Sequence, residues 1–214
     1  MAKKDVGVNI WALVMWAYRA VIVGFSGWYT WTSLTEFHDW NLVSNFAYLT
    51  QITNALVLVF YFGWLVKALL NGARRTADFS PEIRGFVVLL ASMVGLLFNT
   101  LLGPVEGWPS TVAHIIVPAL VVGDWLLFGG NQNRIRRWVP ITWLLPVLAY
   151  LGYYIWFSTS GGYERPYPFL TPTADDFLQW VALLALAFLT GAYLVYFVGK
   201  LVGRIRLGSR STRR

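Results

Sequence analysis

The 214-residue chain is 57% hydrophobic and only 13% charged, with a mean hydropathy of +0.55, a balance that excludes an ordinary soluble domain. The lack of cysteine in the sequence excludes disulfides, thiolate metal sites and thiol nucleophiles. The net charge of +7 accompanies no DNA- or RNA-binding motif, so we expect no nucleic-acid partner.

Six long apolar runs make up most of the chain, and each has about 20 residues or more, enough for a helix to cross a hydrocarbon core of about 30 Å. None shows the two-residue alternation of a barrel strand. The sequence therefore predicts an all-α integral membrane protein, a single-domain bundle of six transmembrane helices. In chain order the predicted helices cover residues 9–33, 44–70, 83–102, 109–129, 138–158 and 177–201, and a basic tail follows at 202–214.

The charged residues segregate between the two ends of the predicted helices. Of the 17 lysines and arginines, all but Arg19 and Arg165 fall on one side, Arg84 among them. The opposite loops carry the acidic residues Glu36, Asp39, Glu106, Glu164, Asp175 and Asp176. The positive-inside rule then predicts that both termini are cytoplasmic. We also expect the basic tail to contact anionic lipids of the inner leaflet.

Two charges interrupt the apolar runs. Arg19 stands about midway along the first predicted helix, where an unpaired charge is costly, and Asp124 lies in the fourth. A structural ion pair or polar relay between them is one interpretation; the other pairs Asp124 with Arg134, Arg136 or lipid headgroups. A transport role would require a water path through both charges, and the lack of an internal repeat argues against it.

Polar residues from different predicted helices fall at one depth. Measured from the tryptophans at the inner ends of their helices, Thr50 lies about 21 Å and His114 about 17 Å toward the outer face. Asn54 shares the helix face of Thr50, and Asn99 lies near the outer end of the third helix. These residues predict a polar pocket that opens outward. Their alternative role is structural, because Thr and Asn in membrane helices often bond carbonyls of their own helix or of neighbouring helices.

The fifth loop is the other candidate for function. Pro166 and Pro168 stiffen the chain around Tyr167 after a flexible stretch rich in Ser and Gly. One interpretation is an aromatic anchor at the membrane interface. The other is a lid over the outward pocket, in which Tyr167 contacts a polar ester group.

Neither a metal nor another cofactor is expected. His38 lies beside Glu36 and Asp39 in the first outer loop, but a bound metal would need further clustered ligands. Haem ligation by His38 and His114 is a weaker alternative. No pattern in the sequence predicts an oligomeric state.

Three short motifs follow one another along the chain. They are Phe46-Ala-Tyr-Leu-Thr-Gln-Ile-Thr-Asn54, then His114-Ile-Ile-Val-Pro118 followed by Asp124-Trp125, then Tyr163-Glu-Arg-Pro-Tyr-Pro-Phe-Leu170. In this order, over roughly residues 10–200, the chain resembles the androgen-induced-protein family of six-helix membrane proteins, the relatives of the androgen-dependent TFPI-regulating protein. It is most similar to the bacterial branch. The resemblance implies a multi-pass protein of the bacterial plasma membrane.

The animal members of this family resemble intramembrane threonine hydrolases that cleave fatty acid esters of hydroxy fatty acids. Their nucleophile stands in a Leu-Thr pair, matched here by Leu49-Thr50, and their essential His precedes a helical proline, as His114 precedes Pro118. The His-to-Pro spacing is one residue shorter here, and the Asn and His that precede their catalytic His are absent. The resemblance implies that Thr50 is a nucleophile and His114 its base, with a long-chain (hydroxy) fatty acid ester as substrate.

The chemistry of such a pair is sound. A threonine hydroxyl attacks an ester only when a neighbouring base takes its proton, and neutral imidazole suits that role near pH 7. Asn54, Asn99 or Tyr167 could donate to the developing oxyanion. Asp124 lies about 15 Å along the helix from His114, too far to complete a triad. We therefore predict a lipid ester hydrolase with a Thr/His dyad. The alternative is a non-catalytic membrane protein that binds a lipid or a protein partner in the same pocket.

Overall fold

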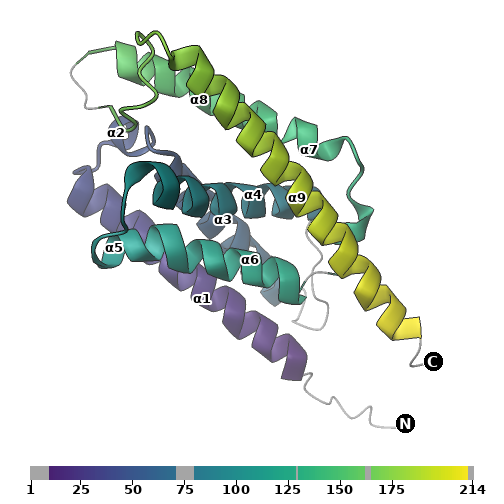
Figure 1. Ribbon diagram of the computed structural model, residues 1–214. Coiled ribbons are helices and arrows are strands. Elements are labelled where there is room, and N and C mark those ends of the chain that lie inside the picture. The colour runs from purple at the N-terminus through teal and green to yellow at the C-terminus, as the bar shows by residue number, and fades with distance from the viewer. Residues whose placement is uncertain (1–9, 71–79, 129, 162–164, 212–214) are drawn as a thin grey trace, which may run out of the picture.

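The computed structural model describes residues 10–70, 80–128, 130–161 and 165–211, without the side chains of 207–211. Within these ranges all regular structure is helical and there is no strand. Six helices are long and apolar enough to cross a membrane: Ile10–Phe37, Leu49–Leu70, Pro81–Leu102, Gly107–Phe128, Val139–Thr159 and Phe177–Arg206. The prediction of an all-α fold with six membrane-length helices is confirmed (Figure 1).

Several spans consist of more than one helical element. In chain order the elements are α1 (Ile10–Thr32), η1 (Ser33–Phe37), α2 (Leu42–Asn45), α3 (Leu49–Leu70), α4 (Pro81–Leu97), η2 (Phe98–Leu102), α5 (Gly107–Thr111), η3 (Val112–Ile116), α6 (Val117–Phe128), η4 (Gln132–Arg134), α7 (Val139–Thr142), α8 (Leu144–Thr159) and α9 (Phe177–Ser211). The elements η1, η2 and η3 are π-helical, whereas η4 is a 3-10 turn.

Three helix boundaries differ from the prediction by more than two residues, and the first of them is the end of the first span, which continues through η1 to Phe37 rather than stopping at residue 33. The second long helix begins at Leu49 rather than at residue 44, because Asn41 caps the separate helix α2 by accepting the Ser44 amide at 3.0 Å. Thr50 therefore lies in the first turn of α3. The last helix continues to Ser211, so most of the predicted basic tail is helical. Other predicted features lie outside the described residues, namely Lys3, Lys4, Arg74, Arg75, Gly129, Tyr163, Glu164 and 212–214.

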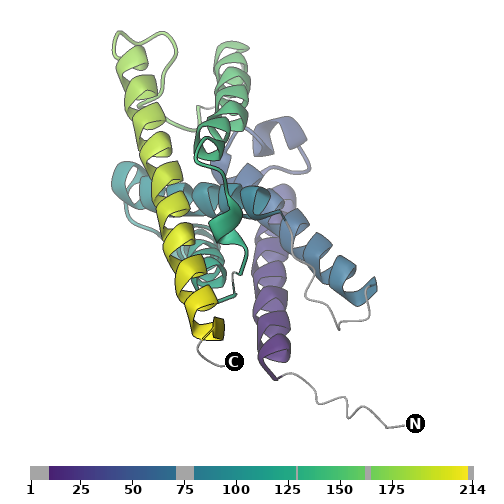
Figure 2. The same cartoon turned by 90° about the vertical axis from the view of Figure 1, so that its right-hand side faces the viewer.

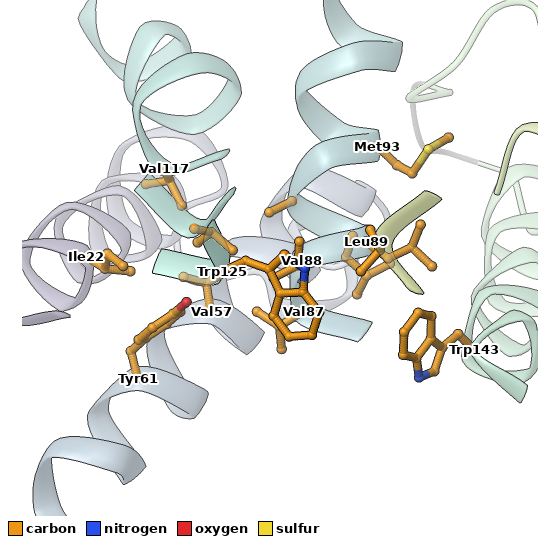
Figure 3. Packing of buried hydrophobic residues seen from close by; sticks show 14 of the residues in the cluster. Ile22, Val57, Tyr61, Val87, Val88, Leu89, Met93, Val117, Trp125 and Trp143 are labelled. Carbon is orange, nitrogen blue, oxygen red and sulfur yellow. The ribbon is translucent and has the colours of Figure 1, made fainter. Parts of the chain in front are cut away.

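Helices α1, α3, α4 and α6 pack against one another and enclose most of the core. Figure 3 shows Val57, Val88 and Trp125, from α3, α4 and α6, close together in its centre, with Ile22 of α1 to their left. Helix α9 crosses α4 and packs against it, and α8 lies beside α9 on one side of the core (Figures 1 and 2). The fifth span bends at Trp143, because Pro146 has no N–H to donate to the Thr142 carbonyl and separates α7 from α8.

Candidate functional site

Thr50 and His114 meet where α3 packs against η3. Oγ1 of Thr50 lies 3.2 Å from Nε2 of His114, whose side chain is buried. Other threonine hydroxyls in these helices donate instead to the carbonyl four residues earlier, the usual arrangement in membrane helices, as in Thr35, Thr100, Thr111 and Thr159. The hydroxyl of Thr50 differs from these four because its partner is an imidazole rather than a main-chain carbonyl.

Ser110 determines which nitrogen of His114 carries the proton. Nδ1 of His114 lies 2.9 Å from the main-chain oxygen of Ser110 and 3.2 Å from its hydroxyl. Because a carbonyl only accepts, the neutral ring holds its proton on Nδ1 and presents the lone pair of Nε2 to Thr50. The Ser110 carbonyl therefore orients the imidazole as a carboxylate does in a catalytic triad.

The π-helical turn η3 positions the imidazole. Pro118 has no N–H for the carbonyl of His114, and the amide of Val117 donates to Val112, five residues earlier. Single π turns inside α-helices are frequent at functional sites. Phe98 of η2 stacks on the His114 ring with a centroid distance of 3.5 Å and an interplanar angle of 18°. The ring is thus held by η3, to which it belongs, and by η2, which continues α4.

An apolar cavity lies beside Thr50. Its volume is about 850 Å³ when the open space at its mouth is included. The polar side chains on its wall are Thr50, Tyr150 and Tyr167. The rest of the wall is apolar and comes from α3, α4, η2, α8, the fifth loop and α9, with Leu97, Leu144, Leu148, Phe169 and Phe188 among its residues. A mostly apolar pocket with a few convergent polar groups suits a lipid chain whose polar group lies at Thr50.

The fifth loop reaches this cavity through Tyr167. The Leu49 amide, next to Thr50, donates to the Tyr167 hydroxyl at 2.8 Å. Tyr154 of α8 holds the loop by donating to the carbonyls of Tyr167 and Leu170, at 3.1 and 2.9 Å. Burial raises the pKa of Tyr167 to about 12, so this hydroxyl is neutral at physiological pH. The loop thus covers the Thr50 end of the cavity.

The two asparagines that the sequence indicated lie apart. Asn54 is buried one turn after Thr50, and its Nδ2 donates to the Thr50 carbonyl at 2.9 Å. Asn99 is exposed, donates to the carbonyl of Gly95 at 2.7 Å, and does not line the cavity. Asn54 therefore adjoins the Thr50–His114 pair, whereas Asn99 does not.

Arg19 and Asp124 form an ion pair inside the bundle, with Arg19 Nε 2.7 Å from Asp124 Oδ1. Arg84 joins them: its Nη2 donates to Oδ2 and to the main-chain oxygen of Asp124, each at 2.5 Å. The Tyr61 hydroxyl also donates to Oδ2, at 3.0 Å. Arg84, which the sequence counted with the basic residues of one side, turns inward from the first turn of α4 and is buried against Asp124.

Aromatic rings accompany the two guanidinium groups of this cluster. The guanidinium carbon of Arg19 lies 4.1 Å from the centroid of Trp64, and that of Arg84 lies 5.3 Å from the centroid of Trp125. Two cations against one carboxylate leave positive charge in the interior, which the electron-rich faces of the indoles attract. The cluster joins α1, α3, α4 and α6, so we interpret it as a structural link within the bundle.

Comparisons of the chain with protein-family models, curated proteins and solved structures found no match. Among the residues around the site, sequence reasoning did not single out Ser110, Phe98 or Arg84. Ser110 stands four residues before His114, a helical spacing that could have indicated their contact. Phe98 and Arg84 reach their partners only through packing between helices, which no local pattern records.

Proposed function

We propose that this protein is an intramembrane lipid ester hydrolase in which Thr50 is the nucleophile and His114 the general base. The contact of 3.2 Å between Thr50 Oγ1 and His114 Nε2 carries the proposal, because the proton on Nδ1 leaves Nε2 free to accept. The neighbouring apolar cavity supports an acyl chain as the rest of the ligand.

In the acylation step, the hydroxyl oxygen of Thr50 attacks the ester carbonyl carbon while its proton passes to Nε2 of His114. Collapse of the tetrahedral intermediate expels the alcohol, which takes the proton back from His114 and leaves an acyl-threonine. In the first turn of α3 the Leu49 amide donates to Tyr167 and the Ile52 amide to the Tyr48 carbonyl, which leaves the amides of Thr50 and Gln51 to donate to the oxyanion. The Tyr167 hydroxyl, which accepts the Leu49 amide, lies close enough to Thr50 to contact the ester group of the substrate.

The motifs shared with the androgen-induced-protein family favour long-chain (hydroxy) fatty acid esters as substrates and the bacterial plasma membrane as the location. The charge distribution favours cytoplasmic termini and a site in the outer half of the bilayer. Exposed Arg136, Arg137 and Arg204 at the opposite end would then meet anionic inner-leaflet lipids. The substrate would enter from the outer leaflet.

A second candidate is a non-catalytic membrane protein that holds a lipid or a protein partner in the same cavity. One observation favours it: Asn54 and Asn99, the expected side-chain donors to an oxyanion, both direct their amides to carbonyls of their own helices. The Thr50–His114 contact would then be a packing hydrogen bond between helices.

Labelling with a long-chain alkyl fluorophosphonate, followed by intact-mass analysis, separates the two candidates. We expect one adduct on the wild type and on Thr100→Val, a control whose hydroxyl donates to the Leu96 and Leu97 carbonyls of its own helix. The adduct should be lost in Thr50→Val and in His114→Ala. A folded wild type that forms no adduct would favour lipid binding without chemistry, and an adduct that survives Thr50→Val would contradict the assigned nucleophile.

A further inference from the structure

Several buried polar atoms close to Thr50 in the chain lack a partner among the described residues, and Oε1 of Gln51 is one of them. Oδ1 of Asn54 and Oγ1 of Thr53 belong to residues that are 1% and 2% exposed, and neither atom takes part in a hydrogen bond. Unpaired polar atoms in an apolar interior are costly and rare. Such atoms commonly bind an ordered water molecule.

The position of Asn54 relates these atoms to the reaction. Its Nδ2 is fixed by the Thr50 carbonyl at 2.9 Å, so Oδ1 is the atom of the amide that remains to accept. Residues four apart on a helix have β-carbons about 5–6 Å apart, which places Asn54 directly inward of Thr50 on the same face. Neither Asn54 nor His114 lines the apolar cavity, whereas Thr50 does. Thr50 thus separates an apolar side from a polar side of the site.

We propose that Asn54, assisted by Thr53, holds the water molecule that hydrolyses the acyl-Thr50 intermediate. This inference rests on the hydrolase function proposed above. One O–H of the water donates to Oδ1 of Asn54, and the other points to Nε2 of His114. The water oxygen attacks the acyl carbon as His114 takes its proton. The bond from this carbon to Thr50 Oγ1 then breaks, the proton passes from His114 to Thr50, and a free fatty acid leaves.

The two half-reactions can be measured separately with p-nitrophenyl decanoate. Release of p-nitrophenol reports acylation, and intact mass reports how much acyl-enzyme accumulates. In Asn54→Leu we expect the initial burst of p-nitrophenol to remain while the steady-state rate falls on the order of ten- to a hundredfold, because misplaced reactants react at about that disadvantage. A decanoyl adduct on Thr50 should accumulate. Thr53→Val, which keeps the side-chain shape, should show a smaller effect in the same direction.

Matched variants test the assignment to the oxygen of Asn54. Asn54→Gln keeps both an amide oxygen and an N–H donor and should recover part of the deacylation rate that Asn54→Leu loses. Asn99→Leu removes an exposed asparagine that makes the same hydrogen bond to its own helix, and should change neither half-reaction. An Asn54→Leu protein that acylates and deacylates as the wild type does would overturn the water site alone. A wild type that releases no more p-nitrophenol than Thr50→Val would overturn the hydrolase function and the water site together.

Discussion

Gly95 of α4 packs directly against the main chain of His114. A β-carbon at residue 95 would lie 3.2 Å from the His114 carbonyl oxygen and 3.2 Å from Cβ of Pro118. The His114 carbonyl has no helical donor, because Pro118, four residues later, has no N–H. Gly95 therefore permits the close approach of α4 to η3, and with it the position of the imidazole.

Substituting Gly95 tests whether this approach sets the geometry of the pair. In Gly95→Ala the added methyl group must push η3 away by a few tenths of an ångström, and in Gly95→Val by more. We expect the rate of fluorophosphonate labelling at Thr50 to fall about tenfold in Gly95→Ala and further in Gly95→Val, because small displacements of reacting groups are costly. Gly152→Ala is the control, since a β-carbon there would contact nothing within 4 Å. Equal labelling rates in all four proteins would contradict this role of Gly95.

The proton position on His114 gives a second prediction that requires no substrate. Since Nδ1 lies 2.9 Å from the Ser110 carbonyl, nitrogen-15 chemical shifts at neutral pH should identify the Nδ1–H tautomer. Because the carbonyl rather than the hydroxyl holds this proton, Ser110→Ala should leave the tautomer unchanged. A ring protonated on Nε2 would instead make Thr50 an acceptor and remove the base from the proposed mechanism.

The buried charge cluster predicts a large effect on stability. Asp124→Asn leaves the guanidinium groups of Arg19 and Arg84 without a carboxylate in the interior, and breaking such a pair costs about 3–5 kcal/mol. We expect a much lower midpoint of thermal unfolding in detergent for this variant. The matched control is Asp175→Asn, at an exposed position in the fifth loop. A similar midpoint in both variants would show that the cluster contributes little.

The sequence could predict the Thr50–His114 pair better than the helix boundary before it and the buried charge cluster. Thr50 and His114 could be placed at one depth because helical rise is constant, and the apolar runs located their helices. The start of α3 was placed five residues early, since hydropathy does not separate the short capped helix α2 from the start of the span that follows it. The burial of Arg84 could not be predicted, because hydropathy near a helix end is the same for a buried and an exposed arginine. Its partner, Asp124, is 40 residues away.

The cavity itself supplies the last prediction, which concerns chain length. Ala185 of α9 lines the cavity, and Ala185→Phe would fill part of the space that an acyl chain occupies. We expect kcat/KM for long-chain p-nitrophenyl esters to fall relative to short-chain esters, since only the longer chains need the filled volume. Ala182→Phe adds the same ring one turn earlier at an exposed position outside the cavity wall, and should leave this ratio unchanged. If Ala185→Phe slowed all chain lengths equally, the ring would be disturbing Thr50 rather than the chain, and the cavity would not be the acyl site.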